Sequence, residues 1–360
     1  MNAPAPRRGG AELCSNVNIY LICVIGVVLS MLASVRATRG FAFGYFLLFT
    51  AVLGGLRWNA GTDWNSYLTY FSNNYSLDSF LGGDIREPVH AVYAFAIKNT
   101  FDAYSAYLVP LAIAISGINV VLLYRYSQGS AFVLCLYFLN TFGNIFFVRQ
   151  TVASAFILLF LHQLRLGKKI GSFLSFCIGV GYHFSAAVFG LAYLAVVKST
   201  RLRIAFFLAL CAIVAVAINL PYVQDKIFFY FTSGATDDFY DESFTSFLSA
   251  RGLWLFIMLL IAFILRQSAQ GEDEKFIARM YYMLCAISFG SFYLPLVSRF
   301  IQYFSFFEVV AFGIVVKSVR NQVLRIGLAS VVLLLYGYKL YAKINFWPGE
   351  TDVFFFAPWL

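Results

Sequence analysis

The sequence predicts an all-α fold, that of a polytopic integral membrane protein with about twelve transmembrane helices. Of its 360 residues, 61% are hydrophobic and only 12% are charged, with a mean hydropathy of +0.77. Soluble domains typically carry charge on about a quarter of their residues. Apolar runs long enough to span a bilayer also recur along the chain. Aromatic residues make up 19% of the chain, which indicates many side chains near the membrane interfaces or around a lipid-facing cavity.

The chain divides into a polar N-terminal arm (1–16), a single transmembrane domain (17–342) and an aromatic C-terminal tail (343–360). The first span is expected over 17–35, because this apolar run is long for the core of a cleaved signal peptide. Further spans are expected over 41–56, 105–124, 131–147, 150–164, 204–220, 251–265, 276–297, 300–316 and 326–342.

The apolar run 170–197 is too long for one ordinary span of about 20 residues. The sequence GVGYHFS interrupts it at 179–185. We therefore expect two short helices that meet at His183.

Basic residues indicate the orientation. More than half of the 26 Lys and Arg residues fall in the short connectors on one side of the predicted spans, which is typical of the cytoplasmic side. The long loops 57–103 and 221–250 and the tail then lie outside. Because successive connectors alternate between the two sides of the membrane, the N-terminus is also placed outside, although Arg7 and Arg8 favour the opposite side.

The stretch 56–71, LRWNAGTDWNSYLTYF, is the most informative part of the first external loop. Trp64, Tyr67, Leu68 and Phe71 follow the i, i+3, i+4, i+7 spacing of one helix face. A short amphipathic helix on the membrane surface is therefore expected, with Thr62 or Asp63 as its N-cap.

An active site is expected on the external face, where cytoplasmic ATP and nucleotide-sugars are absent. A glycan already activated on polyprenyl pyrophosphate would suit such a site, and arginine binds phosphate oxygens well. The external arginines are Arg57, Arg86, Arg149, Arg251 and Arg299. The alternative is that these side chains only reach phospholipid headgroups.

Transfer of a sugar to a hydroxyl also needs a general base, and Asp63, Glu87 and His183 are the external candidates. Asp63 and Glu87 could instead cap helices, and His183 could be a turn histidine bonded to backbone. Glu308 lies within a span, where an ionisable group is costly and usually paired.

Other classes of function find little support. In a membrane protein the net charge of +9 records basic loops, so no nucleic-acid partner is expected. The six cysteines show no metal-ligand spacing, and we expect no cofactor and no metal. The acidic sequence DDFYDE at 237–242 is interpreted as a solvated loop, with a divalent-cation site as the alternative.

Several motifs together resemble the EpsG-type branch of the Wzy polysaccharide polymerases. They are Arg57 with GTDW at 61–64, REP at 86–88, VRQTVASAFIL at 148–158, YHFSA at 182–186, SRF at 298–300 and the ending APWL. Two of them depart from the usual pattern, because Trp64 and Trp359 stand where tyrosine is more common.

The resemblance implies a GT-C-like glycosyltransferase that joins lipid-linked repeat units at the outer face of the bacterial inner membrane. Its donor and acceptor would be polyprenyl-pyrophosphate-linked glycans. A chain-length regulator and a flippase of the same pathway remain open as partners. By analogy, Arg149 and Arg299 would hold pyrophosphate, and His183 or Glu87 would help to deprotonate the acceptor.

The substrate-binding residues expected from this comparison also include Arg57, Arg86, Trp64 and Tyr67, with Asp63 shaping the site. Three rival functions stay open: an O-antigen ligase or another polyprenyl-dependent transferase, a flippase or transporter of the same glycans, and a membrane acyltransferase.

Overall fold

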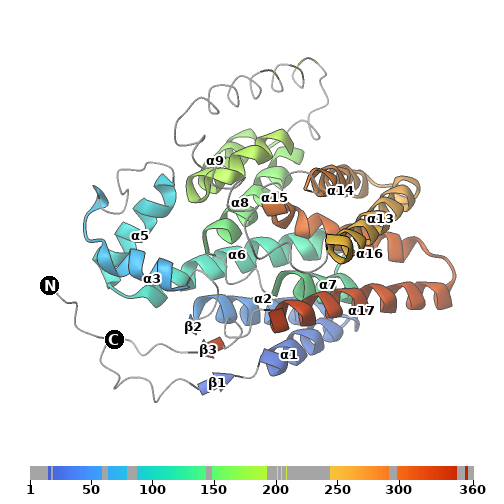
Figure 1. Cartoon of the computed structure of the whole chain (residues 1–360), viewed down its shortest axis with the longest axis horizontal. Coiled ribbons are helices and arrows are strands. Elements are labelled where there is room, and N and C mark those ends of the chain that lie inside the picture. The colour runs from blue at the N-terminus through green and yellow to red at the C-terminus, as the bar shows by residue number, and fades with distance from the viewer. Residues whose placement is uncertain are drawn as a thin grey trace.

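In the residues that it describes, the computed structural model is all-α apart from three short strands (Figure 1). It describes residues 15–17, 19–58, 64–78, 87–142, 148–192, 244–291, 298–346 and 353–355, together with 201, 204 and 208. The predicted span 204–220 and the acidic sequence 237–242 therefore fall almost wholly outside the described residues.

The N-terminal half contains α1 (Ile19–Leu32), α2 (Arg39–Gly55), α3 (Trp64–Asn73), α5 (Pro88–Phe101), α6 (Tyr104–Ser127), α7 (Ala131–Thr141), α8 (Val148–Arg165), α9 (Lys169–Tyr182) and the 3₁₀ helix η3 (Phe184–Ala192). The C-terminal half contains α13 (Phe244–Ser268), α14 (Glu272–Gly290), α15 (Ser298–Ile301), the 3₁₀ helix η5 (Gln302–Phe304), α16 (Ser305–Ser318) and α17 (Gln322–Phe346). In Figure 1, α3 and α5 lie at one end of the molecule and α13 and α14 at the other.

The predicted break at His183 is confirmed, because α9 ends at Tyr182 and η3 begins at Phe184. Several elements differ from the prediction, among them α5, which lies inside the predicted loop 57–103. Helix α7 ends at Thr141 rather than near 147, and α13 begins at Phe244, inside the predicted loop 221–250. The predicted span 300–316 is divided by η5, since three residues there adopt the tighter 3₁₀ turn.

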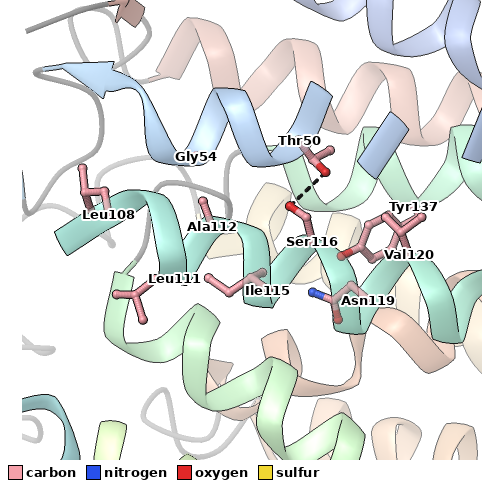
Figure 2. Close-up of a pocket in the computed structure, with 10 residues that line it drawn as sticks. All are labelled: Thr50, Gly54, Leu108, Leu111, Ala112, Ile115, Ser116, Asn119, Val120 and Tyr137. Carbon is pink, nitrogen blue, oxygen red and sulfur yellow. Dashed lines mark hydrogen bonds between the residues drawn. The ribbon is translucent and has the colours of Figure 1, made fainter. Parts of the chain in front are cut away.

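Helix α6 is central and packs against α2, α8 and α16. Its close contact with α2 depends on Gly55, because a Cβ there would lie 3.0 Å from the Cα of Val109. Nearby, Thr50 Oγ1 donates a hydrogen bond to Ser116 Oγ at 3.0 Å (Figure 2). A cavity of about 30 Å³ beside this bond has room for one or two water molecules.

The buried carboxylate of Glu308 links three helices. It accepts a hydrogen bond from Tyr336 Oη at 2.6 Å and one from Asn140 Nδ2 at 3.3 Å. Lys339 Nζ in turn donates to Asn140 Oδ1 at 3.1 Å. The cost of burying Glu308 is thus offset by hydrogen bonds that join α16 to α7 and α17.

The apolar exterior fits a membrane protein. Two described helices, Tyr104–Ser127 and Gln322–Tyr341, are long and apolar enough to cross a bilayer. Shorter apolar helices cover Leu21–Leu32, Arg39–Gly55, Ala131–Thr141, Lys169–Tyr182 and Gly252–Ser268. Helix α17 exposes Leu334 and Tyr338 at more than two thirds of their surface, as expected for side chains that face lipid.

The three strands form an antiparallel sheet in the order β1 (Ser15–Val17), β3 (Val353–Phe355), β2 (Arg57–Trp58). Arg57 pairs with Phe355, and so does Ser15. Short segments at 15–17, 57–58 and 353–355, far apart in the sequence, therefore lie together (Figure 1). The predicted orientation also places these three segments on the same side of the membrane. Hydrophobic periodicity could not predict, however, that the strands pair with one another.

Candidate active site

A carboxylate, a guanidinium and an imidazole converge where α5, α8 and α9 meet. Glu87 lies 62 residues before Arg149 and 96 residues before His183. Arg149 Nη1 donates a hydrogen bond to Glu87 Oε2, and the two side chains form an ion pair. His183 Nδ1 lies 2.6 Å from Glu87 Oε1. One carboxylate thus uses its two oxygens to hold two different side chains.

Glu87 occupies the N-cap position of α5, with Pro88 in the first turn. Its side chain makes no capping hydrogen bond, however, and turns instead toward α8 and the end of α9. The helix-cap interpretation therefore does not account for this residue. Only 15% of its side-chain surface is exposed, so both hydrogen bonds are largely shielded from water.

Arg149 is the second residue of α8 and connects the cluster to α3. Its Nε donates to Tyr67 Oη at 3.1 Å, and its guanidinium carbon lies 5.0 Å from the centre of the Tyr67 ring. The side chain remains 38% exposed, so a phosphate can approach the nitrogens that Tyr67 and Glu87 leave free.

His183 follows the last residue of α9, and its extended backbone (φ −154°, ψ 116°) turns the chain into η3. Because a carboxylate binds Nδ1, the proton of the neutral ring resides on that atom and Nε2 carries the lone pair. The side chain is 31% exposed. With Nδ1 bound to Glu87, Nε2 is the ring nitrogen that can accept a proton.

The charge state of Glu87 follows from its neighbours. Burial alone would raise its pKa, but the hydrogen bond with His183 and the positive charge of Arg149 outweigh burial and lower the pKa below its usual 4.5. Glu87 is therefore ionised at neutral pH. An ionised, doubly bonded carboxylate suits an orienting role better than that of the base.

This pKa shift predicts an acid-sensitive step in stability. The pKa of Glu87 is lower in the folded protein than in the unfolded chain. The ionised carboxylate therefore stabilises the fold fully above pH 4.5, and this stabilisation is lost as the pH falls through the folded-state pKa. We expect the thermal midpoint in detergent to drop as the pH falls below 4.5, and to drop less in Glu87→Gln. Equal drops in the two proteins would contradict the coupling.

An aromatic layer lies behind the cluster. His90, 3% exposed, stacks on Tyr70 at 5.3 Å and contacts the edges of Tyr107 and Tyr182. Burial lowers the pKa of His90 to about 3, so it stays neutral. Trp64 is 4% exposed and packs edge-on against Tyr104, so it belongs to this layer rather than to an exposed platform for substrate.

A glycine allows the close approach of α9 to α5. A Cβ on Gly181 would lie 2.3 Å from Val89 Cγ2 and 2.9 Å from Val89 Cβ, distances that real contacts do not reach. Gly181 precedes His183 by two residues, and Val89 follows Glu87 by two. The absence of a side chain at 181 therefore helps to bring the imidazole to the carboxylate.

We expect Gly181→Ala to destabilise the protein by about 1–3 kcal/mol through overpacking. Val89→Ala in the same protein should recover part of the loss, because it removes the nearer of the two atoms. Thermal midpoints in detergent would measure both effects. Gly117→Ala is the matched control, since a Cβ at that position of α6 would meet nothing within 4 Å. An unchanged midpoint for Gly181→Ala would contradict the close packing.

The remaining predicted site residues are only partly described. Helix α3 begins at Trp64, directly after the predicted cap residue Asp63, but Asp63 and Arg86 lie outside the described residues. Arg57 and Arg299 are placed by their backbones, on β2 and on α15. The described part of the chain holds no group of three or more His, Cys, Asp or Glu residues that could bind a metal ion.

One contact beside the site was not anticipated. Ser185 Oγ and Tyr303 Oη lie 2.8 Å apart and join η3 to η5. The sequence offered a partial signal, because Ser185 belongs to YHFSA and Tyr303 follows Arg299 by four residues.

The fold and the cluster define an all-helical protein with an apolar exterior and a partly exposed carboxylate–arginine–histidine site at its helix ends. The chain belongs to the EpsG family, whose model matches residues 40–351. This membership supports a polysaccharide polymerase-type role. No curated protein and no solved structure matches the chain.

Proposed function

We propose that the protein is a polymerase that joins polyprenyl-pyrophosphate-linked oligosaccharide units into a polysaccharide. The growing chain would be transferred from its lipid carrier to a sugar hydroxyl of an incoming unit. The proposal rests on one observation: Glu87 binds Arg149 with one carboxylate oxygen and His183 with the other. It brings a base and a phosphate-binding cation to one partly exposed place.

In this reaction His183 Nε2 takes the proton of the acceptor hydroxyl. The acceptor oxygen forms a bond to the anomeric carbon while the bond from that carbon to the pyrophosphate oxygen breaks. Direct attack from the opposite face inverts the anomeric centre. Glu87 holds the imidazole in the required tautomer and stabilises the imidazolium that forms.

The departing lipid pyrophosphate gains negative charge, and Arg149 is the described residue that can offset it. Tyr67 fixes the plane of that guanidinium. We assign further phosphate contacts to Arg57, Arg86 and Arg299. Arginines supply the positive charge, so the proposal assigns no step to a metal. Asp63 is kept as either the cap of α3 or an acceptor-binding group.

The proposed setting is the bacterial inner membrane, with the site on the external face and about twelve spans in a GT-C-like arrangement. The basic residues of the short connectors support this orientation. The lipid bilayer and two lipid-linked glycans are the partners the reaction needs. A chain-length regulator and a flippase would act beside the enzyme in the same pathway.

Reconstitution with purified lipid-linked repeat units tests the proposal. We expect a ladder of lengthened, still lipid-linked chains on a gel. Transfer of the glycan to lipid A or protein would indicate a ligase instead, and translocation without new glycosidic bonds would indicate a transporter. No ladder with the authentic substrate would contradict polymerisation.

A further inference from the structure

Arg299 lies in a short segment that leads to a contact with η3, the helix that follows His183. Helix α15 carries Arg299 and continues through η5 into α16. Tyr303 follows Arg299 by four residues, about one helical turn. The placement of this segment therefore decides where the arginine can act.

Tyr303 connects the segment to η3, the helix that follows His183. Its side chain is 3% exposed, and its ring stacks on Phe189 with centroids 4.3 Å apart. Its hydroxyl lies 2.8 Å from Ser185 Oγ. Phe304 also contacts Phe189, at 4.9 Å, so apolar packing supports the hydrogen bond.

Ser185 is held rigidly with respect to His183. The backbone N–H of His183 donates to Gly179 O at 3.0 Å, and that of Ala186 donates to His183 O at 2.9 Å. These bonds fix the backbone between His183 and Ser185, and the contact with Glu87 holds the imidazole itself. A displacement of the Tyr303 hydroxyl is therefore a displacement relative to the proposed base.

We propose that the Tyr303–Ser185 hydrogen bond is a positioning contact that sets the Arg299 segment at a defined distance from His183. The inference rests on the proposed function, in which the histidine acts on the acceptor and the arginine on the leaving pyrophosphate. Stacked rings can slide over each other at little cost, whereas a hydrogen bond fixes distance and direction. The hydroxyl pair thus supplies the alignment that aromatic packing alone does not.

Alignment matters because the two groups act on opposite sides of the anomeric carbon, the histidine at the bond that forms and the arginine at the bond that breaks. Small errors in the placement of reacting groups lower the rate strongly even when binding is kept. Tyr303→Phe keeps the ring and its stacking on Phe189 but removes the hydroxyl. The rate of sugar transfer should then fall while the fold is retained.

The test measures initial rates of chain lengthening in the reconstituted system. We expect Tyr303→Phe and Ser185→Ala each to lower kcat roughly fivefold, and the double variant to be no slower than either single one. Ser185→Thr keeps a hydroxyl and should restore most of the rate. In an Arg299→Lys protein, Tyr303→Phe should have no further effect, because the group it positions is already changed.

Tyr281→Phe is the matched control. Tyr281 is fully buried on α14, and its hydroxyl has no hydrogen-bond partner among the described residues. Its kcat should stay within twofold of wild type. Wild-type rates for Tyr303→Phe, or additive losses in the double variant, would overturn the positioning role alone. A wild-type protein that makes no ladder would overturn the proposed function and this inference with it.

Discussion

Glu87→Gln should lower the rate of chain lengthening by about 10²- to 10⁴-fold, the range typical of lost general acid–base catalysis. The amide keeps the size of the side chain but not its charge. It can present either its oxygen or its NH₂ group to His183 Nδ1, so the tautomer with a free lone pair on Nε2 is no longer enforced. It also leaves Arg149 without its ion-pair partner. The measurement is the initial rate with lipid-linked repeat units.

Two further variants sharpen this result. His183→Ala combined with Glu87→Gln should be only slightly slower than His183→Ala alone, because the lost orientation of the imidazole no longer matters and only the lost ion pair with Arg149 remains. Glu272→Gln, on an exposed carboxylate at the start of α14, should leave the rate unchanged. If the Glu87→Gln protein lengthens chains at the wild-type rate, the carboxylate does not orient the base.

Arg149→Ala should abolish long polymer, with a rate loss of about 10²- to 10³-fold, as for a lost transition-state donor. The variant removes the cation that would meet the leaving pyrophosphate, together with its contacts to Tyr67 and Glu87. Arg149→Lys should recover only part of the rate, because an ammonium cannot bind phosphate in a bidentate fork. Gel ladders and initial rates measure both variants.

The matched control is Arg325→Ala, which removes an exposed arginine near the start of α17. Arg325 lies at the opposite face in the predicted orientation, so if both arginines serve only to reach lipid headgroups, Arg149→Ala and Arg325→Ala should behave alike. If an Arg149→Ala protein inserts normally into the membrane and still makes polysaccharide of wild-type length, Arg149 does not have the proposed phosphate-binding role.

The sequence predicted which residues form much of the candidate site, but it did not predict the contacts between them. The break at His183 follows from an apolar run too long for one span and from its glycines, so local sequence sufficed. The helix that begins at Trp64 follows from periodicity. Periodicity cannot show, however, that Tyr67 on this helix contacts Arg149, which lies 82 residues further along the chain.

Glu87 shows what the neighbouring sequence could not predict. Its position before Pro88 is typical of a helix cap, yet its side chain makes no capping bond. The carboxylate turns away because an arginine and a histidine from other helices lie within hydrogen-bond distance. Trp64 is the converse case, since its spacing predicted one face of a helix on the membrane surface, but packing against Tyr104 buries it within the protein.

The sequence by itself determined the all-α class, the apolar character of the helices and the kinds of side chain available for chemistry, because composition and periodicity act over a few residues at a time. Only the tertiary structure decided that Glu87 joins Arg149 to His183. That contact depends on how closely α5, α8 and α9 approach, and the approach depends on details such as the missing side chain of Gly181 beside Val89. Such distances arise from packing between segments far apart in the chain, which no local pattern records.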